Sequence, residues 1–167
     1  AATDTLCRHF LLPYFHKWQL QESEIGLHII NRPSPDCVEL VLNKEAQLAV
    51  VNDYEGLRDN PQLEVTTLAT IQDVFVGGPD YKGAGFFDQG RLLNEPILLL
   101  HKGSASRTFF DEVTHGACRK PRFELGSVDV LLDLVEINMG ISMLPNHVVQ
   151  QKMQEGSIVR IDTDIPV

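Results

Sequence analysis

The sequence predicts an α/β protein made of two small subdomains, and three observations support this prediction. Short continuous apolar runs such as 96–100 suit strands that are buried on both faces. These runs alternate with segments of helical periodicity, which is typical of parallel sheets joined by helices. Two such series flank the β-branched stretch 64–76, which is too long for a typical strand. We therefore expect 64–76 to be a strand that crosses between the subdomains as a hinge.

In the first half, an apolar stripe at three- and four-residue intervals predicts a helix over about 5–20. Pro13 lies inside it and lacks a backbone donor, so we expect a kink or a restart there. Alternating apolar residues then predict a strand over 25–29. A helix over about 35–44 follows, for which Ser34 supplies the capping hydroxyl.

The apolar run 48–51 predicts a strand buried in a parallel sheet. In the second half, alternation resumes after a Gly-rich segment that ends near Gly90. Strands are expected at 96–100, 122–125, 141–144 and 157–161, separated by helices that begin at Ser104 or Ser106, at Ser127 and at Pro145.

Composition limits the possible functions. The chain has 167 residues, of which 43% are hydrophobic and 22% are charged, as in an ordinary globular protein. The formal charge is -9, and there is no block of consecutive Lys or Arg, so this chain should not itself bind DNA. No apolar run approaches the roughly 18 residues of a membrane span, and no signal peptide is evident. The sequence begins at Ala1 without Met, so we expect it to be a piece of a longer protein.

The three cysteines, Cys7, Cys37 and Cys118, form neither a CxxC motif nor an even set. They indicate a reducing cytoplasm rather than a disulfide framework. Cys37 stands near a helix start, where a lowered thiol pKa is physically possible, but the simpler expectation is that these residues fill a core.

Candidate ligand-binding residues follow from the expected fold. In open α/β sheets, ligands bind beyond the carboxyl ends of strands, where helix N-termini direct amides at anions. Small hydroxyl residues and a flexible cationic loop occupy these positions, which suits a small carboxylate or phosphate. The same hydroxyls could instead simply cap helices. The candidates are Thr3, Asp4, Thr5, Arg32, Ser34, Asp53, His101, Lys102, Gly103, Ser104, Ser127 and Val128.

Signals for an enzyme are weak. No GxSxG elbow is present, and the glycines of 76–83 do not have the spacing of a phosphate-binding loop. The six histidines form no HxxxH or HExxH pair, so no metal site is predicted. We expect no catalytic residue and no cofactor.

Several phrases, taken in order, resemble the effector-binding domain of LysR-type transcriptional regulators, a bacterial family with a periplasmic-binding-protein type II-like fold. The most specific is 127–145, in which Leu134-Val135, Gly140-Ile141 and Leu144-Pro145 resemble the family's "LVAAGLGIALLP" segment. The other phrases are Phe10-Leu11-Leu12-Pro13, 39–41 with 47–51, 95–99 and 103–107.

The resemblance implies a cytoplasmic sensor that binds a small anionic effector in the cleft between two lobes and alters the packing of a homodimer or tetramer. DNA would be bound only through a winged helix-turn-helix that this chain lacks, and no membrane is involved. The implied subdomains are 1–72 and 73–162, with 163–167 starting a return crossover. The family pattern also implies that the first subdomain is incomplete, because a first strand should precede Ala1 and a strand and helix should follow the crossover. A solute-binding protein of a transporter, with the same fold, is the alternative.

Overall fold

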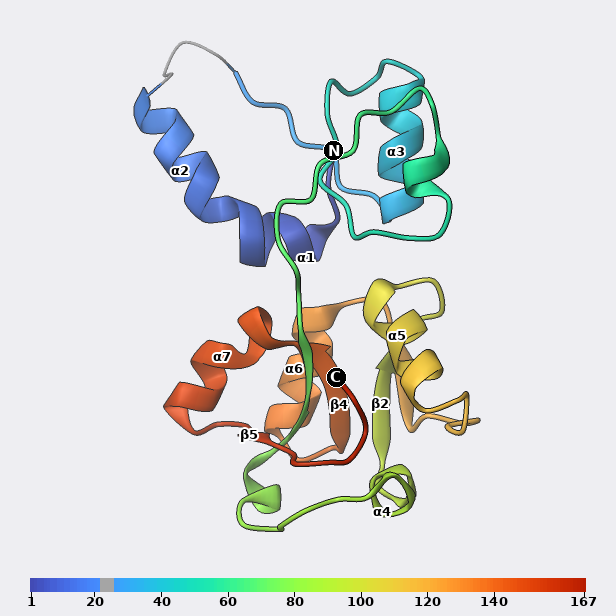
Figure 1. Cartoon of the computed structure of the whole chain (residues 1–167). Coiled ribbons are helices and arrows are strands. Elements are labelled where there is room, and N and C mark those ends of the chain that lie inside the picture. The colour runs from blue at the N-terminus through green and yellow to red at the C-terminus, as the bar shows by residue number, and fades with distance from the viewer. Residues whose placement is uncertain (22–25) are drawn as a thin grey trace. The chain divides into compact units, whose positions relative to one another are not determined.

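The chain forms two compact units (Figure 1). The computed structural model describes residues 1–21 and 26–167. Unit 1 is Ala1–Leu68 and unit 2 is Ala69–Val167. The boundary lies in the stretch 64–76, of which only β1 (Asp73–Gly77) is a strand. The single long strand predicted there is wrong, because residues 66–72 are exposed and pair with no strand in the described part of the chain.

Unit 1 begins with the predicted helix, which is confirmed as three consecutive segments. They are α1 (Asp4–Leu6), a π-helical turn (Cys7–Leu11) and α2 (Leu12–Gln21). Thr3 caps the start, because its Oγ1 accepts from the Leu6 N–H at 3.2 Å. The expected irregularity at Pro13 takes the form of the π-helical turn just before it, in which the Leu12 N–H bonds to the Cys7 oxygen.

The two strands predicted in unit 1 are wrong. Of the segment 25–29, Ile25 lies outside the described residues and 26–29 have no strand pairing; 48–51 has a single bridge. Ala2 makes that bridge with Val50 and another with Asn31. Among the residues that the structure describes, Ala2 alone bridges to each side, so no ladder extends and Leu48 stays mostly exposed. The predicted second helix is confirmed as α3 (Ser34–Leu42), and a 3₁₀ turn follows at Leu57–Asp59.

Unit 2 contains a five-stranded mixed sheet in the order β3-β2-β4-β1-β5. β2 pairs in parallel with both β3 and β4, as predicted for this half. β1 runs antiparallel to β4 and β5, which corrects the expectation of a wholly parallel sheet. The remaining strands are β2 (Ile97–Leu100), β3 (Phe123–Leu125), β4 (Ile141–Pro145) and β5 (Val159–Arg160).

Helices cover both faces of this sheet (Figure 1). Along β2, Leu98 and Leu100 face one cluster with α6 and α7, and Ile97 and Leu99 face another with α4 and α5. This alternation explains the continuous apolar run, because both faces of the strand are buried. The helices are α4 (Gln89–Asn94), α5 (Ala105–Val113), α6 (Val128–Glu136) and α7 (Asn146–Glu155), with a 3₁₀ turn at Pro79–Tyr81.

A close backbone contact holds the start of β4. Gly140 has φ +155°, and a Cβ there would lie 2.0 Å from the Pro96 oxygen. The Ile141 N–H donates to the same oxygen at 2.9 Å. Only glycine fits this contact, which aligns the starts of β2 and β4. No helix in the described part of the chain has the length and hydrophobicity needed to cross a membrane.

Candidate functional site

The predicted residues of unit 2 meet at one edge of the sheet. β2 and β3 are parallel and in register, with Leu100 opposite Leu125, so the loops after both strands emerge together. The His101 N–H donates to the Leu125 oxygen at 2.9 Å. A Cβ on Gly126 would lie 3.5 Å from His101 Nδ1, so these loops touch. The sheet therefore brings 101–104 and 127–128 into one site.

Two helix N-termini lie at this edge. The Ser104 Oγ accepts from the Arg107 N–H at 3.3 Å and caps α5, and the Ser127 Oγ accepts from the Val130 N–H at 3.3 Å and caps α6. Both capping predictions are confirmed. Each hydroxyl still has a proton to donate, and the first amides of each helix have no intrahelical partner. The pair of caps can therefore donate several hydrogen bonds to one anion.

The remaining residues of this edge differ in what they can offer. His101 and Lys102 are exposed, and the Lys102 ammonium has no ion pair with any residue that the structure describes. Gly103 has φ +93°, a conformation that glycine permits in this tight loop. The Val128 side chain is buried in the core cluster, so only its backbone amide faces the edge.

Arg107 is a buried residue that holds the strand ends next to this edge, a role that the sequence did not predict. Its side chain is only 5% exposed and donates to the Leu100 oxygen at 3.1 Å. It also bonds to the carboxylates of Asp111 and Glu124, at 3.0 Å and 2.9 Å. Burial lowers the pKa of Arg107, but the hydrogen bonds that it donates to the two carboxylates outweigh this effect and leave the pKa raised. The only sequence signal was an Arg four residues before an Asp on a predicted helix.

Asp73 is a second residue that the sequence did not indicate. It is the first residue of β1, opposite Pro145 at the carboxyl end of β4, so it lies at the same edge. The side chain is buried and within hydrogen-bond reach of Ser106 in the first turn of α5. Burial raises the pKa of this carboxyl, and the Ser106 hydrogen bond partly opposes the rise.

The candidates of unit 1 gather around the bridges of Ala2. The Arg32 N–H donates to the Ala2 oxygen at 3.4 Å, which places Arg32 beside the segment Thr3, Asp4 and Thr5. The Ser34 Oγ accepts from the Asn52 N–H at 3.1 Å and joins α3 to the loop before Asp53. The predicted role of Ser34 as a helix cap is wrong, because it is the first residue of α3 and its oxygen bonds to that loop.

Asp53 and Cys37 have partners that limit their chemistry. Arg58 Nε and Nη2 lie 2.9 Å and 2.8 Å from Asp53 Oδ2, and Nη2 also donates to Thr67 Oγ1. Cys37 is fully buried, and its thiol donates to the Arg32 oxygen at 3.1 Å. Burial raises the pKa of Cys37, so its helix start does not produce a thiolate, and core filling is confirmed for this residue.

The sequence matches the LysR substrate binding domain over residues 1–167. The chain therefore belongs to the LysR substrate-binding domain family, and its architecture is the periplasmic-binding-protein type II fold expected from the resemblance. It matches no curated protein sequence at a significant level.

Solved structures of LysR-type proteins show the same fold. The regulatory domain of AphB from Vibrio vulnificus is 17% identical and superposes with a TM-score of 0.71 over 96% of this chain and 81% of that chain. HinK, a LysR family transcriptional regulator from Pseudomonas aeruginosa, is 17% identical with a TM-score of 0.77, over 99% of this chain and 58% of that chain. The effector-binding domain of QuiR, solved in complex with shikimate, is 15% identical with a TM-score of 0.76, over 99% of this chain and 79% of that chain. The chain thus spans little more than half the length of HinK.

Proposed function

We propose that this chain is the effector-sensing domain of a LysR-type transcription regulator and that it binds a small anionic metabolite, a carboxylate or a phosphate. The observation that carries the proposal is the adjacent N-termini of α5 and α6 beside Lys102. The family match favours this role over that of a transporter's solute-binding protein. We propose no catalytic role for any residue.

Electrostatics support an anion rather than a cation. Each helix N-terminus favours a negative charge by about 0.3–1 kcal/mol, and more where it is partly buried. The Ser104 and Ser127 hydroxyls can donate to the anion while they continue to accept from their helices. Lys102 adds a full positive charge at the same edge. Thr3, Asp4, Thr5, Arg32, Ser34 and Asp53 are the proposed contacts from unit 1.

A binding screen tests the proposed site. A panel of small carboxylates and sugar phosphates, with shikimate included because QuiR was solved with it, is titrated calorimetrically and by thermal shift. A ligand at about 100 times its Kd should stabilise the chain by roughly 2.7 kcal/mol. Ser127→Ala should weaken any hit by about tenfold, or roughly 1.4 kcal/mol. Ser157→Ala, which removes a half-buried hydroxyl of the same unit outside this edge, is the matched control.

Two results would contradict the proposal. One is the absence of any binding by the folded chain across the panel. The other is an equal affinity of the Ser127→Ala variant and the wild-type chain, because the α6 cap would then not contact the ligand.

The proposed signal is a change in how subunits pack in a longer, DNA-binding protein. A ligand shifts such an equilibrium only through its different affinities for the two states, and a tenfold shift requires about 1.4 kcal/mol of preference. We propose that the protein is a homodimer or tetramer and that it is located in the cytoplasm. Free thiols are stable in that reducing compartment, and Cys7, Cys37 and Cys118 form no disulfide in the described structure. Sedimentation velocity of the full-length protein, with and without ligand, would contradict this if its distribution did not change.

A further inference from the structure

The most basic segment of the chain lies away from the proposed effector site. Arg119, Lys120 and Arg122 place three cations within four residues of a protein whose formal charge is -9. All three are exposed and lie between α5 and β3. None of them has an ion pair or side-chain hydrogen bond with any residue that the structure describes. Their charge therefore contributes nothing evident to the fold.

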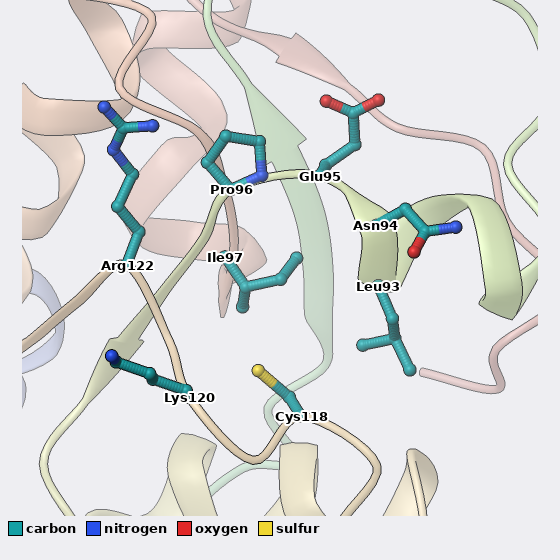
Figure 2. Close-up of a pocket in the computed structure, with 8 residues that line it drawn as sticks. All are labelled: Leu93, Asn94, Glu95, Pro96, Ile97, Cys118, Lys120 and Arg122. Carbon is teal, nitrogen blue, oxygen red and sulfur yellow. The ribbon is translucent and has the colours of Figure 1, made fainter.

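Two of these cations line a cavity of about 270 Å³ (Figure 2). Figure 2 shows Lys120 and Arg122 on one side and α4 on the other, with Cys118 and Ile97 between them. Leu93, Pro96 and Ile97 supply apolar surface. Pockets that hold drug-sized ligands have volumes of about 300–1,000 Å³, so this smaller cavity suits a smaller molecule.

The acidic and thiol groups of the lining do not cancel the positive charge. Glu95 is the one carboxylate among the lining residues, and its Oε2 accepts a hydrogen bond from the Tyr81 hydroxyl at 3.0 Å. Burial raises the pKa of the Cys118 thiol, which keeps it neutral near pH 7 although Arg107 and the Lys120 amide oppose the rise. Lys120 and Arg122 therefore leave the cavity with a net positive charge.

We propose that this cavity is a second binding site, distinct from the effector edge, for a small organic anion with a phosphate or carboxylate head and a short apolar tail. Lys120 and Arg122 hold the head, and Leu93, Pro96 and Ile97 contact the tail. The site lies at the opposite end of β2, because Ile97 is the first residue of that strand and Leu100, next to the effector loop, is the last. A nucleic-acid backbone is less suited to this cavity, because binding to phosphates is electrostatic and would make no use of the apolar surface of Leu93, Pro96 and Ile97.

The test uses n-butyl phosphate and butyrate as probes, with inorganic phosphate and butanol as matched head-only and tail-only compounds. Backbone ¹⁵N–¹H spectra of the chain are recorded during each titration. We expect saturable shifts of amides in 93–97 and 118–122 with one or both probes, separate from any shifts at the effector edge in 101–104 and 127–128. Lys120→Gln combined with Arg122→Gln should weaken that binding by about tenfold or more, equal to about 1.4 kcal/mol.

Arg119→Gln is the matched control, because it removes an exposed cation of the same loop that does not line the cavity and should leave these shifts unchanged. The proposal fails if neither probe gives saturable shifts at 93–97 and 118–122, or if the double variant binds as tightly as the wild-type chain. It also fails if inorganic phosphate binds as tightly as both probes, because the apolar wall would then contribute nothing. Short duplex DNA that shifts the same amides where the probes do not would assign the loop to a nucleic acid instead.

Discussion

The guanidinium of Arg107 donates to the backbone oxygen of Leu100 over 3.1 Å, so the first turns of α5 hold the last residue of β2. The same side chain bonds to Glu124 on β3. A single buried cation on α5 is thereby hydrogen-bonded to both β2 and β3, the two strands whose following loops form the effector edge.

Replacement of this cation should destabilise unit 2. Arg107→Met removes the hydrogen bond to the Leu100 oxygen and leaves Asp111 and Glu124 without their partner. Both carboxylates are about 40% exposed and can be hydrated, so we expect a loss of about 2–3 kcal/mol in the free energy of unfolding. Urea denaturation measures it, and Arg119→Met, at an exposed position, should change stability by less than about 0.5 kcal/mol. Equal stability of the two variants would contradict the role of Arg107.

Asp73 should make stability depend on pH. Because its pKa is raised in the folded state, the folded chain binds its proton more tightly than the unfolded chain does. This residue's contribution is fully present below the ordinary Asp pKa of about 3.9 and is lost as the pH rises through the raised pKa. Asp73→Asn keeps a neutral partner for Ser106, so the variant should be more stable than the wild-type chain at pH 7.

Unfolding curves at several pH values check this expectation. The difference between Asp73→Asn and the wild-type chain should shrink as the pH falls through the raised pKa toward 4, because the folded wild-type carboxyl takes up its proton in that range. A difference that stays constant from pH 4 to pH 7 would show that burial of this carboxyl carries no proton linkage.

Substitution of Ser104 can separate helix capping from ligand binding. Aspartate is as good an N-cap as serine, so Ser104→Asp should keep the free energy of unfolding within about 0.5 kcal/mol, whereas Ser104→Ala should lose about 1 kcal/mol. The new carboxylate repels an anionic ligand, so we expect Ser104→Asp to bind any carboxylate or phosphate found in the screen at least about tenfold more weakly. Calorimetry measures the affinity, and wild-type affinity in Ser104→Asp would place the anion elsewhere.

Gly140 should tolerate no side chain. A Cβ there would lie 2.0 Å from the Pro96 oxygen, and its φ of +155° is unfavourable for any other residue. We expect Gly140→Ala to cost about 3 kcal/mol or more in stability. Gly26→Ala, where no atom of the described residues lies within 4 Å of the new Cβ, should stay within about 0.5 kcal/mol. Thermal unfolding measures the stability of both variants. Similar melting temperatures would contradict the expected clash between a side chain at position 140 and the Pro96 oxygen.

The parts of the fold predicted from the sequence are those whose signals are local. The apolar run before His101 and the serine caps of α5 and α6 depend on nearby residues alone, and they were predicted correctly. Asp88, which caps α4 by accepting from the Arg91 N–H, is a similar local signal that was overlooked.

The incorrect predictions depend on partners distant in the sequence. Residues 26–29 and 48–51 alternate or cluster like strands, but a strand requires a neighbour along its length. In the described part of unit 1, the only bridges are those from Ala2 to Asn31 and to Val50. The antiparallel direction of β1 leaves no trace in its composition. Asp73 and Arg107 acquire their roles only through tertiary contacts with Ser106, Leu100 and Glu124, which no spacing in the sequence encodes.

The π-helical turn at Cys7–Leu11 has a consequence for the surface of the first helix. A π-helical turn contains one residue more than an α-helical turn, and one residue corresponds to about 100° of rotation. If the same residues formed a regular α-helix instead, the extra residue would rotate α2 by roughly that angle about its axis, and Leu12, Tyr14 and Leu20, all more than half exposed, would point in another direction. The direction in which the apolar side chains of α2 point therefore depends on the one extra residue in this turn as well as on the composition of α2.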